Sequence, residues 1–123
     1  MTLPRSLLHE NFKRGLDLFN RAHFFDAHEA LEDVWRKAPA SQKKLFQGLV
    51  QVALAFHHYS TGNRVGMKSV MGRAMRNMAE ARETFSGIRV QPLLETLAAW
   101  REALDQGSPL PPLPRIEAPE KDG

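Results

Sequence analysis

The segment between residues 41 and 60 constrains the fold more than any other part of this 123-residue chain. Its apolar residues cover almost the whole circumference of a helix, whereas a surface helix carries a single apolar stripe. They are Leu45, Phe46, Leu49, Val50, Val52, Ala53, Leu54, Ala55, Phe56 and Tyr59. A helix of this kind packs against neighbours on several sides, and no apolar run approaches the roughly 18 residues of a membrane span. We therefore predict a helix at the centre of a helical bundle.

Four further segments show the apolar periodicity of amphipathic helices, and none shows the alternation of a strand. They span about residues 4–21, 26–38, 64–85 and 92–105. At the second of them, Asp26 and Glu29 have the spacing of a capping box, with Phe25 as a hydrophobic staple. Pro39 ends that helix, because proline disfavours the helical conformation of the residue before it. The sequence therefore predicts an all-α, single-domain bundle of about five helices.

The end of the chain differs in composition from the helices. Residues 108–123 contain five of the eight prolines, and a proline-rich segment is extended rather than helical. We therefore expect a helical bundle domain over residues 1–107 and an extended Pro-rich tail over residues 108–123, lying on the bundle surface.

Composition limits the chemistry and the location. The chain has no cysteine, which excludes disulfides, thiolate zinc sites and a cysteine nucleophile, so any metal site must rest on His and carboxylate side chains. Neither a membrane span nor the apolar core of a signal peptide is present, so we expect a cytosolic protein. No motif indicates a cofactor.

Polar residues in the second and third helices form the candidate site. His28 and Glu32 are four residues apart and share one helix face. The segment resembles an H-E-x-x-H zinc helix, but Glu32 stands where the second His is required. On the central helix, Gln47, Gln51 and His58 fall on one narrow polar stripe. Because a short connection makes the two helices antiparallel neighbours, we expect these side chains to meet.

Two interpretations of this constellation stay open at the level of sequence. A saturated network would fix helix register, whereas a network open to a cleft would bind a ligand. We predict a ligand- or partner-binding module rather than an enzyme. The candidate polar-site residues are His28, Glu29, Glu32, Trp35, Gln47, Gln51 and His58. The alternative is a metal-dependent enzyme with His28, Glu32 and His58 as ligands and Glu29 as acid–base.

The fourth helix suggests two kinds of partner. Its basic residues raise a second alternative, nucleic-acid binding, which their scattered helical angles and the net charge of only +3 disfavour. They are Arg64, Lys68, Arg73 and Arg76. Methionines at helical spacing on the same helix, together with the excess of apolar positions on the third, predict a homodimer. These methionines are Met67, Met71, Met75 and Met78.

Two stretches of the chain resemble domain-of-unknown-function family 309. Residues 24–36 read FFDAHEALEDVWR, residues 45–53 read LFQGLVQVA, and Gly62-Asn63 follows. The family pattern is an aromatic-x-x-H-E-x-x-E-x-x-W helix, then a Q-G-[LI]-x-Q-hydrophobic-A helix and a G-N turn. The resemblance covers roughly residues 10–80 and implies an all-helical fold, without an established activity or cofactor. It also implies that six residues belong to one constellation: His28, Glu32, Trp35, Gln47, Gly48 and Gln51.

Overall fold

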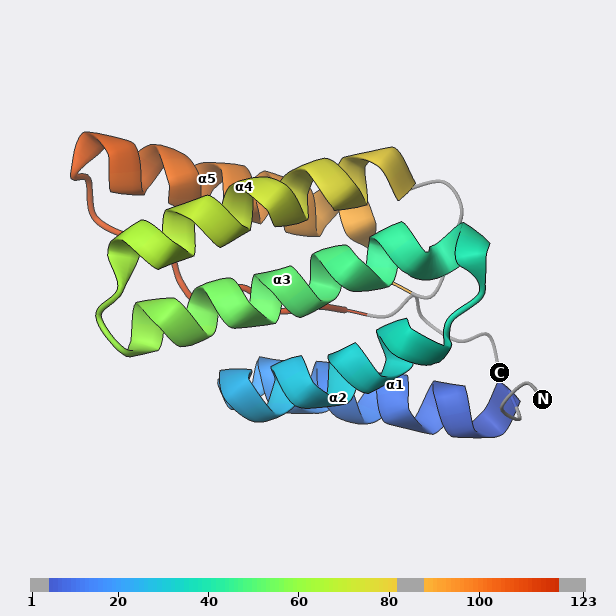
Figure 1. Ribbon diagram of the computed structural model, residues 1–123. Helices are drawn as coiled ribbons and strands as arrows, with labels where there is room; N and C mark the ends of the chain where they lie inside the picture. Colours follow the sequence, from blue (N-terminus) through green and yellow to red (C-terminus); the bar gives the residue numbers. More distant parts are fainter. Residues whose placement is uncertain (1–4, 82–87, 118–123) are drawn as a thin grey trace.

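The computed structural model describes residues 5–81 and 88–117, and these residues form an all-α bundle without strands (Figure 1). The helices are α1 (Arg5–Asn20), α2 (Phe24–Lys37), α3 (Lys43–Ser60), α4 (Arg64–Ala81) and α5 (Val90–Gln106), with a short 3-10 turn, η1 (Ala40–Gln42), before α3. The predicted fold class is confirmed. The parts of the predicted helices at residue 4 and residues 82–85 lie outside the described residues.

The central position of α3 is visible in both the ribbon and the core. Figure 1 shows α3 between a layer of α1 and α2 and a layer of α4 and α5. The ring of Phe56 lies 6.1 Å from Phe19 of α1, 5.7 Å from Phe24 of α2 and 5.1 Å from Trp100 of α5. One fully buried side chain of α3 therefore joins three other helices, as expected for a helix that is apolar all round.

The predicted capping box of α2 is wrong. The helix begins at Phe24, and the amide of Ala27 donates to the carbonyl of His23 at 2.9 Å, so His23 is the N-cap residue and Asp26 lies inside the first turn. The physical reason is that Phe24 is buried against Phe19 at 5.2 Å, and this packing places the residue within the helix. Asp26 still favours the helix electrostatically, because acidic groups stabilise the first turn.

The chain after α5 returns along the bundle. Gly107 ends α5 in the left-handed conformation, with φ of 68°, and segment 108–117 then runs between α5 and α1 alongside α3 (Figure 1). The indole Nε1 of Trp100 donates to the carbonyl of Pro112 at 3.0 Å. Asn20 of α1 accepts from the amide of Ile116 at 2.8 Å and donates to its carbonyl at 3.0 Å. Segment 108–117 therefore packs as part of the fold.

None of the described helices combines the length and the hydropathy that crossing a membrane requires.

Candidate binding site

The predicted site residues of α2 have local partners. Glu32 forms an ion pair with Arg36, 3.3 Å apart on the same helix. The ammonium of Lys43 lies 5.3 Å from the centre of the Trp35 ring and donates to the carbonyl of Trp35 at 2.8 Å. The Trp35 carbonyl also accepts from the amide of Ala38 at 3.3 Å, so Lys43 is a second donor to this carbonyl at the end of α2. Glu29 is exposed. Trp35 and Glu32 thus have roles in the stability of α2.

The polar stripe of α3 faces α4 more than α2. Gln51 accepts a hydrogen bond of 2.8 Å from the side chain of Asn77 on α4, and the Nδ1 atom of His58 lies 3.4 Å from the side-chain nitrogen of Asn63 in the α3–α4 connection. The reason lies in Gly48, three residues before Gln51 and on the same helix face. A Cβ atom at Gly48 would lie 2.5 Å from Met78 Cγ, so this face of α3 is the one in closest contact with α4.

The predicted network between α2 and α3 is not formed by hydrogen bonds in the described part of the chain. His28 and Glu32 share no hydrogen bond with Gln47, Gln51 or His58 there. Gln47 is half-buried. The structure therefore brings the candidate helices together without joining their polar side chains.

His28 keeps a buried ring nitrogen without a partner. Its Nδ1 atom is inaccessible to solvent and has no hydrogen bond within the described residues. The ring of Phe25, itself 49% exposed, lies 6.0 Å from the His28 ring and 5.2 Å from the His57 ring. His28 thus has a structural place beneath Phe25.

The proposed metal ligands are not assembled. Among residues 5–81 and 88–117, no three His, Asp or Glu side chains are close enough together to hold a metal ion. Glu32 is bound to Arg36, and His58 lies beside Asn63. The geometry of the described residues therefore gives the metal-dependent alternative no ligand set.

Several side chains of α4 have an ion-pair partner, a hydrogen-bond partner or a place in the core within the chain. Lys68 forms an ion pair of 2.5 Å with Asp105, which ties α4 to α5, and the guanidinium of Arg73 donates to Ser69. The methionines Met67, Met71 and Met78 are buried in the core. They therefore present no exposed surface to a second chain, and the homodimer remains a prediction from the sequence.

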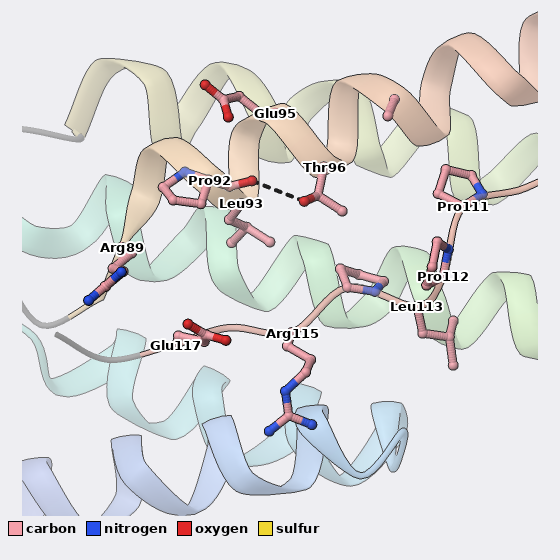
Figure 2. A pocket seen from close by; sticks show the side chains of 12 residues that line it. Arg89, Pro92, Leu93, Glu95, Thr96, Pro111, Pro112, Leu113, Arg115 and Glu117 are labelled. Atoms are coloured by element: carbon pink, nitrogen blue, oxygen red, sulfur yellow. Dashed lines mark hydrogen bonds between the residues drawn. The ribbon is translucent and has the colours of Figure 1, made fainter. Parts of the chain in front are cut away.

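A groove lies between α5 and segment 108–117 (Figure 2). Its volume is about 630 Å³, within the range of roughly 300–1,000 Å³ that is typical of ligand pockets. The walls are mainly apolar, and the groove also contains two arginines and two glutamates. Its residues on the α5 side are Arg89, Pro92, Leu93, Glu95, Thr96 and Ala99, and those of the segment are Pro111, Pro112, Leu113, Pro114, Arg115 and Glu117.

The segment borders this groove with residues whose backbone groups have no partner among the described residues. Along it, Pro114 and Ile116 are buried while Leu113, Arg115 and Glu117 are exposed, which is the alternation of an extended strand. The backbone of Ile116 is bonded toward α1, and the carbonyl of Glu117 accepts from the amide of Arg89 on the α5 side. By the same alternation, the backbone groups of Arg115 point away from α1, and Leu113 and Arg115 both line the groove. The backbone N–H and C=O groups of these two residues have no hydrogen-bond partner within the described residues.

A second hollow continues the groove toward α1. Its volume is about 480 Å³, and α1 contributes Lys13, Leu16, Asp17 and Asn20. It shares Arg89, Arg115 and Glu117 with the groove, so the two depressions meet at these side chains. Figure 2 shows the Arg115 side chain extending from the segment toward α1.

The sequence predicts a site between α2 and α3 and indicates neither of these two depressions. The missed signal is Ile116, an isolated large apolar residue after the proline run. A segment that lies free on a surface has no need of such a residue, whereas Ile116 is only 1% exposed and anchors the segment in the core.

The comparisons with known proteins confirm the family resemblance. The family model described as "Domain of unknown function (DUF309)" matches residues 12–70, just under half of the chain. An uncharacterized protein of Aquifex aeolicus (strain VF5) is 33% identical over 97 residues, which are 76% of this chain and 29% of that protein. The uncharacterized protein YpuF of Bacillus subtilis (strain 168) is 33% identical over 54 residues, which are 43% of this chain and 31% of YpuF. The matched part of the chain thus spans less than a third of either relative.

Proposed function

We propose that this chain, whose residues 12–70 belong to the DUF309 family, is a binding module that holds an extended peptide segment of another protein between α5 and segment 108–117. One observation carries the proposal: Leu113 and Arg115, whose backbone N–H and C=O groups have no partner among the described residues, line a groove with mainly apolar walls. Because the groove lies outside residues 12–70, peptide binding is proposed for this chain and not for every DUF309 protein.

These backbone groups and the groove walls would have separate roles. An extended peptide can add to an exposed strand edge through its own main-chain groups, and alternate side chains then enter pockets beside it. The backbones of Leu113 and Arg115 would supply the main-chain hydrogen bonds. The apolar pocket beside them is formed by Pro92 and Leu93 of α5 and by the proline rings of the segment. A peptide with an apolar side chain opposite Leu93 fits both features.

The cytosolic location expected from the sequence is part of the same proposal. A chain without cysteine loses no stabilising disulfide in a reducing compartment.

A peptide selection tests the proposal. Peptides are selected from a random displayed library on the full chain, and their affinities are measured by fluorescence polarisation. Leu113→Pro removes one backbone N–H and keeps an extended conformation, so it removes a hydrogen bond worth about 0.5–1.5 kcal/mol. We expect it to weaken binding by about 2- to 10-fold.

A matched pair of variants shows whether the peptide occupies the groove. Ala99→Trp places a bulky ring in the groove, whereas Ala98→Trp adds the same ring at an exposed neighbouring position that does not line it. We expect Ala99→Trp to abolish most binding and Ala98→Trp to preserve it, with similar unfolding midpoints for both variants. The proposal is refuted if no peptide is enriched, or if the enriched peptides bind both variants equally.

A further inference from the structure

We infer that the bound peptide carries a carboxylate at the point where it leaves the groove and enters the hollow beside α1. The carboxylate belongs either to an Asp or Glu side chain or to the end of a chain, because the recognising groups are the same for both. The inference rests on the proposed function and adds to it the chemical class of the partner segment.

The groove and the hollow form one continuous path. Both are bordered by Arg89, Arg115 and Glu117, so a peptide lying in the groove passes between the two arginines at this end. Beyond them, the hollow is bounded by α1, where Lys13 supplies a third cation.

The charges around the hollow favour an anion. Lys13, Arg89 and Arg115 form no ion pair with any described residue, although all three border this one depression. Of the two acids that line it, Asp17 is paired with Arg21 at 3.4 Å, which leaves Glu117 alone opposite three cations. A carboxylate on the peptide would offset part of this excess of positive charge. Guanidinium groups bind carboxylates in a planar, two-point geometry.

The cation cluster is assembled only by the packing of the segment. Lys13 lies on α1, Arg89 precedes α5, and Arg115 lies on segment 108–117. The bonds of Asn20 to the backbone of Ile116 hold the segment to α1, and the bond from the Arg89 amide to Glu117 holds it to the start of α5. Residues that are far apart in the sequence therefore border one hollow because the segment closes the bundle.

The test uses one selected peptide resynthesised in matched forms. Glu or Gln is placed at each end of the peptide in turn, and every form is made with a free C-terminal carboxylate and with a C-terminal amide. Comparing Glu with Gln, and acid with amide, separates a side-chain carboxylate from a terminal one. Because exposed ion pairs contribute about 0.2–1 kcal/mol each, we expect the preferred carboxylate to tighten binding by about 2- to 10-fold at low salt.

Substitutions in the protein locate the effect. Lys13→Gln combined with Arg115→Gln removes two of the three cations, so we expect the ratio of the affinities for the acidic and the neutral form of the same peptide to fall to about one. Arg64→Gln removes an exposed arginine of α4 that does not line either depression and should preserve the preference. The preference should also decline as salt screens the charges.

The outcomes separate the inference from the proposed function. If the neutral and the acidic peptides bind equally well and both are excluded by Ala99→Trp, the carboxylate inference is overturned and the peptide groove stands. If the acidic peptide is preferred equally by the wild type and the double variant, the cations do not recognise it and the inference is also overturned. If Ala99→Trp affects no peptide, both the inference and the proposed function fail.

Discussion

Replacing Gly48 by alanine tests how closely α3 packs on α4. A Cβ atom at this position would lie 2.5 Å from Met78 Cγ, 3.2 Å from the Ala74 carbonyl oxygen and 3.4 Å from the Met78 backbone nitrogen. The methionine side chain can rotate away, but the two backbone atoms cannot move without shifting α4. Gly48→Ala therefore forces the two helices apart or leaves a compressed contact.

The expected magnitude follows from two opposing terms. Overpacking of a close contact costs about 1–3 kcal/mol. Alanine in a helix interior is favoured over glycine by about 0.5–1 kcal/mol, because the glycine backbone loses more entropy on folding. The sum for Gly48→Ala is a destabilisation of roughly 0–2.5 kcal/mol.

Gly72 provides the matched control. It lies inside α4 like Gly48 inside α3, but a Cβ atom there would meet only the Nη1 atom of Arg76, at 3.7 Å. Gly72→Ala should therefore stabilise the fold by about 0.5–1 kcal/mol. Because the backbone term is common to both substitutions, the difference between the two variants isolates the overpacking of about 1–3 kcal/mol.

The free energy of unfolding of each variant is measured by urea denaturation, followed by circular dichroism and by tryptophan fluorescence. Trp100 is 1% exposed and reports the core between α5 and segment 108–117. The reasoning is refuted if Gly48→Ala is as stable as Gly72→Ala, because the close approach of α3 and α4 would then have no energetic consequence.

Two further predictions concern the attachments of segment 108–117 and of α5. Asn20→Ala removes both hydrogen bonds to the backbone of Ile116, so we expect a loss of about 1–3 kcal/mol in urea denaturation and faster hydrogen exchange of the Ile116 amide; unchanged exchange would contradict the attachment. The hydrogen bond from Lys68 holds the pKa of Asp105 below its usual value, with the charges of Lys68 and Arg101 adding to the effect. Lys68→Gln should raise the Asp105 pKa toward that usual value in an NMR titration, and an unchanged pKa would show that Lys68 is not the cause. Because the folded-state pKa is lowered, this interaction stabilises α4 against α5 above the unfolded-state pKa and is lost as the pH falls through the folded-state pKa.

Helix ends show where local sequence signals succeed and fail. Asn63 caps α4, because its side chain accepts a hydrogen bond of 2.9 Å from the amide of Gly66. Gly107 ends α5, because glycine adopts positive φ without a steric cost. The end of α1 has no comparable glycine. The residue in the left-handed conformation there is Ala22, with φ of 65°, which alanine rarely adopts. There, the amides of Ala22 and His23 donate to carbonyls of the last turn of α1, each at 2.9 Å, and close the turn.

The candidate site shows the larger limit. The sequence places Gln47, Gln51 and His58 on one polar stripe of α3, but it could not say which neighbouring helix the stripe would face. The close contact of Gly48 with α4 decides that rotation and directs Gln51 to Asn77. Spacing along one helix shows which residues share a face, whereas the neighbour of that face depends on how two helices pack.

The sequence by itself determined the all-α class, the five main helical segments and the central place of α3, because apolar periodicity is a local property of each segment. Only the tertiary structure decided the partners of the polar residues and the course of segment 108–117. The contacts that settle these features join residues such as Asn20 and Ile116, which lie 96 positions apart. No local pattern specifies such a pairing, because it depends on the shape left between helices once the core has packed.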